Sequence, residues 1–105
     1  MSFMITEKMI LECYDAFKEG NRKFVPKGMN ETSARMTMSW LNCMLNIGTC
    51  FNRSGSLMQY RVILEQISLD YGSQRAKEAA LSQMKYYVRY KRESHITILK
   101  GFINI

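Results

Sequence analysis

Residues 30–52 read NETSARMTMSWLNCMLNIGTCFN, and this stretch decides the fold class. Its apolar side chains recur at helical spacing in two adjacent stripes, which are Met36, Trp40, Met44, Ile47 and Phe51, and then Ala34, Met38, Leu41 and Leu45. A helix that is apolar around so much of its circumference is usually buried on several sides. We therefore predict a helix over about residues 30–52 at the centre of a small all-α bundle.

Capping and stop signals mark further helices on either side of this stretch. Thr6 has the position of an N-cap, and Gly20 offers a stop for a first helix whose acidic residues should face outward. Ser56, followed three residues later by Gln59, forms a capping box and is the best-marked boundary in the chain. We expect the first helix to lie across the central one.

The turn at Gly72 allows two interpretations. Gly72 ends the third helix, and Ser73 is expected to cap the fourth. This turn also allows a helix-turn-helix in which Gln74, Arg75 and Lys77 would contact base edges. Ser73 stands where that motif usually has an apolar packing residue, so an ordinary antiparallel helix pair is the favoured interpretation.

The segment from Ser94 onward is ambiguous between helix and strand. Its apolar residues have helical spacing, namely Ile96, Leu99, Phe102 and Ile103, whereas the run from Ile96 to Ile98 alternates as in a strand. Because this C-terminal segment is so apolar, it must pack either against the rest of its own chain or against a second subunit. The fold prediction is a single all-α domain over residues 1–105, with four or five helices.

The net charge of +6 is unevenly distributed along the 105 residues. Residues 1–20 carry a net charge of −2, and residues 21–105 carry +8. Such a surplus favours association with polyanions, which include nucleic acid, anionic lipid and acidic protein surfaces. Solubility alone is the alternative explanation.

Residues 85–92 read KYYVRYKR and concentrate cations and aromatic rings with no intervening acid. Cations at these positions can neutralise phosphates. The candidate phosphate contacts are Lys85, Arg89, Lys91 and Arg92, and Arg75 and Lys77 would extend this surface. The alternative is a solvated helix end whose cations favour the C-terminal dipole.

The tyrosines of this run are expected to divide between surface and core. Tyr86 and Tyr90 lie four residues apart, so a helix would present them as an exposed pair flanked by cations. Exposed rings of this kind stack on bases or support such a contact. Tyr87 and Val88 are expected to point inward.

A second candidate surface is a narrow polar stripe on the predicted central helix, made of Arg35, Ser39, Asn42, Asn46, Thr49 and Arg53. Its middle four members are uncharged, whereas exposed helix faces usually carry Lys and Glu. Uncharged polar groups suit a half-buried contact with a helix, a protomer or a ligand, because they hydrogen-bond without the desolvation cost of a charge. The stripe and the apolar tail together suggest a homodimer.

Catalysis and metal binding find little support in the sequence. The single histidine, His95, is expected to be solvated or to cap a helix, and no base oriented by a third group is visible. The three cysteines do not match structural zinc spacing. If one helix carries Cys43 and Cys50, they lie roughly 10 Å apart along its axis, which is too far for a disulfide. We expect buried reduced thiols, no metal, no cofactor and no enzymatic activity.

These features favour a small non-enzymatic protein of the cytoplasm that binds nucleic acid. The first residues lack the pattern of a signal peptide, and no apolar stretch approaches the length of a membrane span. The alternative function is a protein-binding module that docks on an acidic surface of a nucleic-acid-handling complex. Inhibitors, adaptors and accessory subunits share this profile, and so do small inhibitors from phages or other mobile elements.

Overall fold

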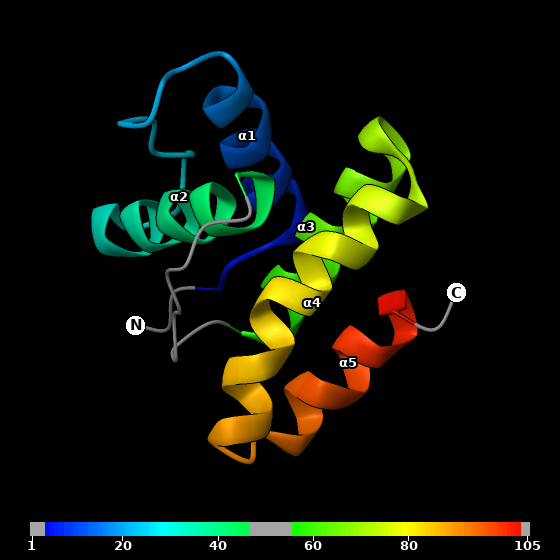
Figure 1. Cartoon of the computed structure of the whole chain (residues 1–105). Helices are drawn as coiled ribbons and strands as arrows, with labels where there is room; N and C mark the ends of the chain where they lie inside the picture. The colour runs from blue at the N-terminus through cyan, green and yellow to red at the C-terminus, as the bar shows by residue number, and fades with distance from the viewer. Residues whose placement is uncertain (1–3, 47–55, 104–105) are drawn as a thin grey trace.

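The computed structural model describes residues 4–46 and 56–103, and these ranges contain helices and no strand (Figure 1). The helices of the described ranges are α1 (Glu7–Lys18), α2 (Glu31–Leu45), α3 (Leu57–Tyr71), α4 (Ser73–Arg89) and α5 (Glu93–Ile103). The predicted all-α class with four or five helices is confirmed. None of the described helices is long and apolar enough to cross a membrane.

The helices begin where short-range side-chain caps satisfy the free backbone N–H groups. The Thr6 hydroxyl accepts from the backbone of Met9 at 3.2 Å, as predicted for α1. Asn30 caps α2 in the same way through the backbone N–H of Ser33, at 2.7 Å. The fourth helix differs from the prediction, because Gly72 is its N-cap and Ser73 is already its first helical residue.

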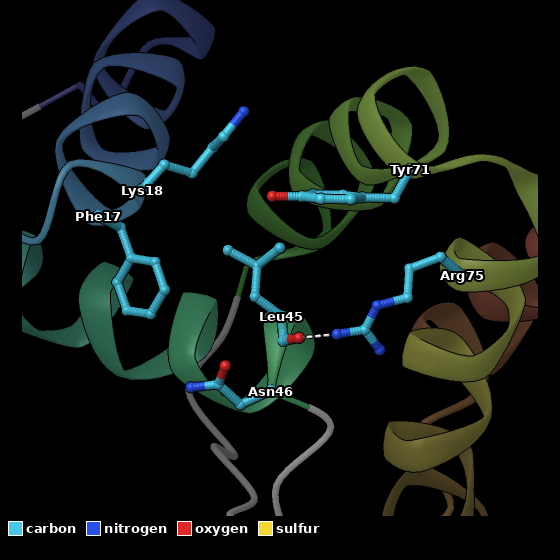
Figure 2. Close-up of a pocket in the computed structure, with 6 residues that line it drawn as sticks. All are labelled: Phe17, Lys18, Leu45, Asn46, Tyr71 and Arg75. Atoms are coloured by element: carbon cyan, nitrogen blue, oxygen red, sulfur yellow. Dashed lines mark hydrogen bonds between the residues drawn. The ribbon is translucent and has the colours of Figure 1, made fainter.

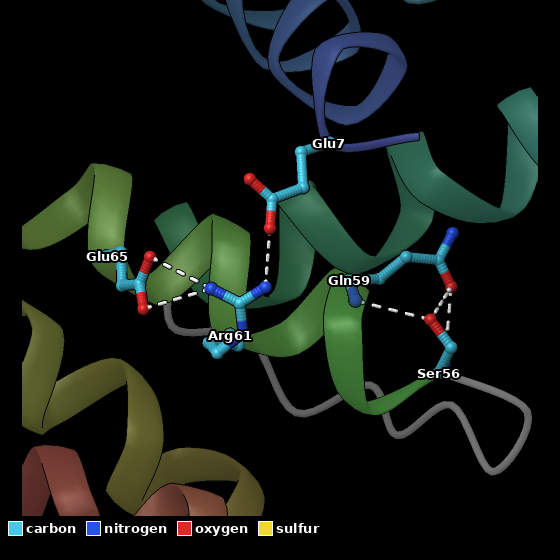
Figure 3. Close-up of polar contacts among 5 residues, drawn as sticks. All are labelled: Glu7, Ser56, Gln59, Arg61 and Glu65. Atoms are coloured by element: carbon cyan, nitrogen blue, oxygen red, sulfur yellow. Dashed lines mark hydrogen bonds and ion pairs between the residues drawn. The ribbon is translucent and has the colours of Figure 1, made fainter. Parts of the chain in front are cut away.

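The capping box of α3 also joins α3 to α2. Ser56 and Gln59 cap each other as predicted (Figure 3). The side chain of Gln59 is 2% exposed, and its Nε2 donates to the hydroxyl of Thr37 on α2 at 3.3 Å. That hydroxyl donates in turn to the carbonyl oxygen of Ser33 at 2.8 Å. A buried polar chain of this kind fixes the register of the two helices, because each group would otherwise lose a partner.

The helix predicted for residues 30–52 is shorter, and it shares the centre with α3. It ends at Leu45, and the residues that follow Asn46 lie outside the described ranges. α2 packs against α1, α3 and α4, whereas α3 contacts each of the other described helices. Ile63, Leu64 and Ile67 of α3 are all fully buried. The core is therefore arranged around α3, with α2 covering one side.

Two ion pairs show that α1 and α3 run in the same direction. Arg61 near the start of α3 bonds Glu7 at the start of α1, at 2.5 Å, and also bonds Glu65 (Figure 3). Lys18 at the end of α1 bonds Asp70 near the end of α3, at 3.0 Å. The acidic residues of α1 therefore lie toward the outside, as predicted, and one of them ties α1 to the neighbouring helix.

The ion pair between Lys18 and Asp70 predicts an acid-dependent loss of stability. The hydrogen bond from Lys18 lowers the pKa of the Asp70 carboxyl below its usual value. A carboxylate with a lowered folded pKa stabilises the protein above its unfolded pKa of about 3.9, and this contribution disappears as the pH falls through the folded pKa. Asp70→Asn should therefore lower the melting temperature at neutral pH but not in strong acid.

Thermal melts followed by circular dichroism across this pH range would measure the difference. Lys18→Gln should produce a smaller loss, because Asp70 also accepts from Gln66 at 3.0 Å, and Asp70→Asn should cost less in the Lys18→Gln background than in the wild type. If Asp70→Asn lowered the melting temperature equally at every pH, the ionised carboxylate of Asp70 would not be the source of the stability.

The ambiguous C-terminal segment is helical. α5 packs against both α3 and α4, and its Ile96 and Leu99 are buried. The apolar character of this segment is therefore explained by the core of the same chain. The last two residues lie outside the described ranges.

The cysteines differ in state. Cys13 is a buried free thiol, and burial, followed by the charge of Glu12, raises its pKa to about 11. Cys43 is also buried, but it is disulfide-bonded. The prediction of a reduced thiol is wrong for Cys43, because it assumed a helix that continues past Leu45. The same prediction for Cys50 lies outside the described residues.

Candidate functional site

The four predicted phosphate contacts lie together at one end of the bundle. Lys85 and Arg89 are on the last turns of α4, and Lys91 and Arg92 form the connection to α5. All four are exposed, and the connection lies at the bottom of Figure 1, away from the loop between α1 and α2. We call Lys85, Arg89, Lys91 and Arg92 the turn patch.

The turn patch is not neutralised by acidic side chains. Elsewhere, Lys18 is paired with Asp70, Arg35 with Glu31, and Arg61 with Glu7 and Glu65. Within residues 4–46 and 56–103, no member of the turn patch forms an ion pair. Adjacent uncompensated cations raise the local potential and attract an anionic partner.

The tyrosines around the turn patch divide differently from the prediction. Tyr90 is 44% exposed, and the Arg89 guanidinium carbon lies 5.9 Å from its ring centroid. Tyr86 is only half-buried rather than fully exposed, with Lys85 Nζ 5.1 Å from its ring centroid. Tyr87 points inward as predicted, but Val88 is 55% exposed, so the inward prediction is wrong for Val88. The inner face of α4 is turned toward both α3 and α5, and Val88 lies outside that face.

A cluster of aromatic rings joins α3, α4 and α5 next to the turn patch. The ring of His95 on α5 stacks on Tyr87 of α4 with centroids 4.5 Å apart, and Tyr60 of α3 meets both rings edge-on. Burial raises the pKa of Tyr60 to about 12 and raises that of Tyr87 still further, so both hydroxyls stay protonated at neutral pH. His95 is therefore a half-buried residue whose ring joins three helices, whereas the sequence suggested a solvated or capping residue.

A shallow pocket lies beside the turn. It has a volume of about 380 Å³ and is lined by Leu57, Lys91, Arg92, Glu93, Ser94 and His95. Two cations of the turn patch, Lys91 and Arg92, therefore share this pocket with the carboxylate of Glu93.

Arg75 and Lys77 do not belong to the turn patch. Arg75 lies fourteen residues before Arg89, which places it about 21 Å away along the axis of α4. Its guanidinium donates to the carbonyl oxygen of Leu45, so it closes the end of α2 (Figure 2). Lys77 is half-buried on another side of α4. The contact of Arg75 within the chain weakens its part in the predicted extension, and the extension through Arg75 and Lys77 stays a prediction.

The packing of Arg75 also speaks against a helix-turn-helix. Gly72 alone separates α3 from α4, whereas that motif usually has a turn of three or four residues. Arg75 instead lines a pocket of about 290 Å³ with Phe17, Lys18, Leu45, Asn46 and Tyr71 (Figure 2). Its side chain is occupied in holding helices together and is not directed outward as a base reader would be.

The polar stripe of α2 serves contacts within the chain. Arg35, Ser39 and Asn46 are exposed, whereas Thr49 and Arg53 lie outside the described residues. The Asn42 side-chain oxygen accepts from Asn46 at 2.6 Å and from Arg22 at 3.5 Å. The stripe thus helps to fix the loop between α1 and α2.

Arg22 is the anchor of that loop. Its guanidinium lies 4.5 Å from the ring centroid of Phe17, in addition to its bond to Asn42.

The homodimer stays a prediction. It was based on the apolar tail and on the polar stripe of α2, and both now support it less. The tail is packed within the chain, and part of the stripe already has partners.

No group of three or more potential metal ligands occurs among the residues that the structure describes. Searches for related proteins found no matching family, curated protein or solved structure. Only the chemistry of the protein surface therefore indicates a function.

Proposed function

We propose that this protein is a non-enzymatic nucleic-acid-binding protein whose turn patch contacts phosphates. The observation that carries the proposal is the gathering of Lys85, Arg89, Lys91 and Arg92 at one end of the bundle, all exposed and without ion pairs in the described part of the chain. Cations that hold phosphates release condensed counterions, which provides most of the affinity of sequence-independent binding.

The tyrosine beside the turn patch supports this function. Tyr90 is the most exposed ring of the basic run and lies next to Arg89. An aromatic face flanked by cations suits stacking on an unpaired base, which tolerates any sequence. The proposed surface therefore combines phosphate contacts with one stacking position.

The proposal predicts a steep dependence of binding on salt. If all four cations contact phosphates, affinity should fall about 50-fold for a single strand and about 150-fold for a duplex between roughly 50 and 200 mM salt. Fluorescence anisotropy with labelled single-stranded DNA, duplex DNA and single-stranded RNA would measure these slopes. Failure of the wild-type protein to bind any of the three at low salt would reject the proposal.

A protein-binding function is the second candidate, and a specific feature of α4 favours it. Leu81 and Val88 are 46% and 55% exposed, and they lie seven residues apart on one face with Lys85 between them. A face that mixes apolar and basic side chains suits an acidic protein surface with an apolar centre.

A pull-down with and without nuclease would separate the two candidates. A nuclease-resistant partner that is lost in the double variant Leu81→Ser/Val88→Ser, but retained when the turn patch is neutralised, would favour the protein-binding module. A partner that disappears with nuclease treatment would favour nucleic acid.

A further inference from the structure

Lys91 has a backbone conformation that lysine rarely adopts. Its φ is 55°, and it is the only non-glycine residue with a positive φ in the part of the chain that the structure describes. The backbone N–H of Lys91 donates to Val88 at 3.2 Å, and that of Arg92 donates to Tyr87 at 2.9 Å. These two bonds form a Schellman motif, which closes α4 and places Lys91 at the left-handed position.

The same motif closes α1 with a glycine at the equivalent position. Gly20 has a φ of 86°, and its backbone N–H donates to Phe17 at 3.0 Å. The N–H of Asn21 donates to Ala16 at 2.9 Å. Because the left-handed conformation brings a Cβ atom close to the following carbonyl oxygen, glycine has the lower energy there. The chain thus uses glycine at one of two equivalent positions and lysine at the other.

Neither packing nor an ion pair gives a reason for a lysine at this position, and the dipole of α4 favours any cation near its end without requiring a left-handed residue. The Lys91 side chain is exposed, and it forms no ion pair with the acids of the described ranges. Lys91 lies in the connection from α4 to α5, between Arg89 and Arg92 in sequence, and it lines the shallow pocket. Strained residues that contribute nothing to packing are concentrated at functional positions.

We propose that the ammonium group of Lys91 binds the phosphate at the centre of the contact, and that this contact is the reason why a lysine occupies the left-handed position. A glycine would relieve the backbone strain at this position, but it has no side chain and so cannot supply a cation to the turn. This inference rests on the proposed function, since it identifies the central contact of that same surface.

The test compares the stability and the binding of Lys91→Gly. Relief of the left-handed strain, less the conformational entropy that glycine adds to the unfolded chain, should raise the melting temperature by several degrees. Loss of one phosphate contact should weaken binding at 0.1 M salt by about five-fold for a single strand and about eight-fold for a duplex. The slope of log affinity against log salt should become shallower by about 0.7 or 0.9, respectively.

Three control variants separate the charge from the conformation. Lys91→Arg keeps the charge and the strain, so it should bind and melt like the wild type. Lys27→Gln removes an exposed cation from the loop between α1 and α2, at the other end of the bundle, and should leave the affinity nearly unchanged. Gly20→Lys should lower the melting temperature through its φ alone, since no atom lies within 4 Å of a Cβ built there.

Each outcome bears on the inference. A Lys91→Gly protein that binds as tightly as the wild type would overturn it, even if the wild type binds nucleic acid as proposed. A Lys91→Gly protein that melts at or below the wild-type temperature would overturn the argument from strain. If the wild type binds no nucleic acid, the proposed function fails first, and the inference fails with it.

Discussion

Replacement of Lys85, Arg89, Lys91 and Arg92 together by glutamine is expected to weaken nucleic-acid binding by several hundred-fold at moderate salt. Each phosphate contact with a single strand contributes about 0.7 to the salt slope, so four contacts contribute about 2.8. The release of counterions contributes nothing to the affinity at 1 M salt. At 0.1 M salt, release by four contacts raises the affinity for a single strand by about 600-fold. Anisotropy titrations at several salt concentrations would measure both the affinity and the slope.

The matched control removes the same charge from other surfaces. Lys8, Lys23, Lys27 and Lys100 are all exposed, and none of them forms an ion pair within the described residues. Their replacement by glutamine changes the net charge equally, but it should lower the affinity far less, because screening confines the attraction to nearby charges. Equal losses in the two quadruple variants would show that net charge governs binding and would refute a localised patch.

Leu64→Ala is expected to destabilise the fold by about 2–5 kcal/mol, because it removes a buried side chain and leaves a cavity. Leu64 is fully buried on α3, the helix that contacts each of the other described helices. This is a large share of the roughly 5–15 kcal/mol that stabilises a typical domain. Urea denaturation followed by circular dichroism at the helical wavelength would give the free energy of unfolding.

The same substitution on the same helix provides the control. Leu69 is 80% exposed, so Leu69→Ala should change the free energy of unfolding by less than about 0.5 kcal/mol. Helix propensity and the loss of a leucine are identical in the two variants, and only burial differs. Similar effects at the two positions would contradict the placement of α3 at the centre of the core.

The helices and most of their ends could be predicted from the sequence because those features are local. A cap such as Thr6 acts on a backbone N–H three residues away, and the capping box at Ser56 is equally short in range. Gly20 ends α1 because its backbone adopts a positive φ at no steric cost. The sequence also predicted that the four cations of the turn patch lie together, because they fall within eight consecutive residues.

Predictions that depended on distant neighbours were less successful. Arg75 closes the end of α2, thirty residues earlier in the chain, and no local pattern identifies Leu45 as its partner. His95 was expected to be solvated or to cap a helix, and its ring packs on Tyr87 and Tyr60. Those contacts exist only after α3, α4 and α5 have come together.

The sequence by itself therefore determined the helical class, the caps of α1 and α3 and the concentration of charge in residues 85–92. Those properties arise from periodicity and from hydrogen bonds within one or two turns of a helix. Only the tertiary structure decided that α3 contacts every other described helix, that Val88 faces outward, and that Lys91 adopts a positive φ. The physical reason is that burial and turn geometry depend on which helices pack together, and residues far apart in the sequence settle that packing.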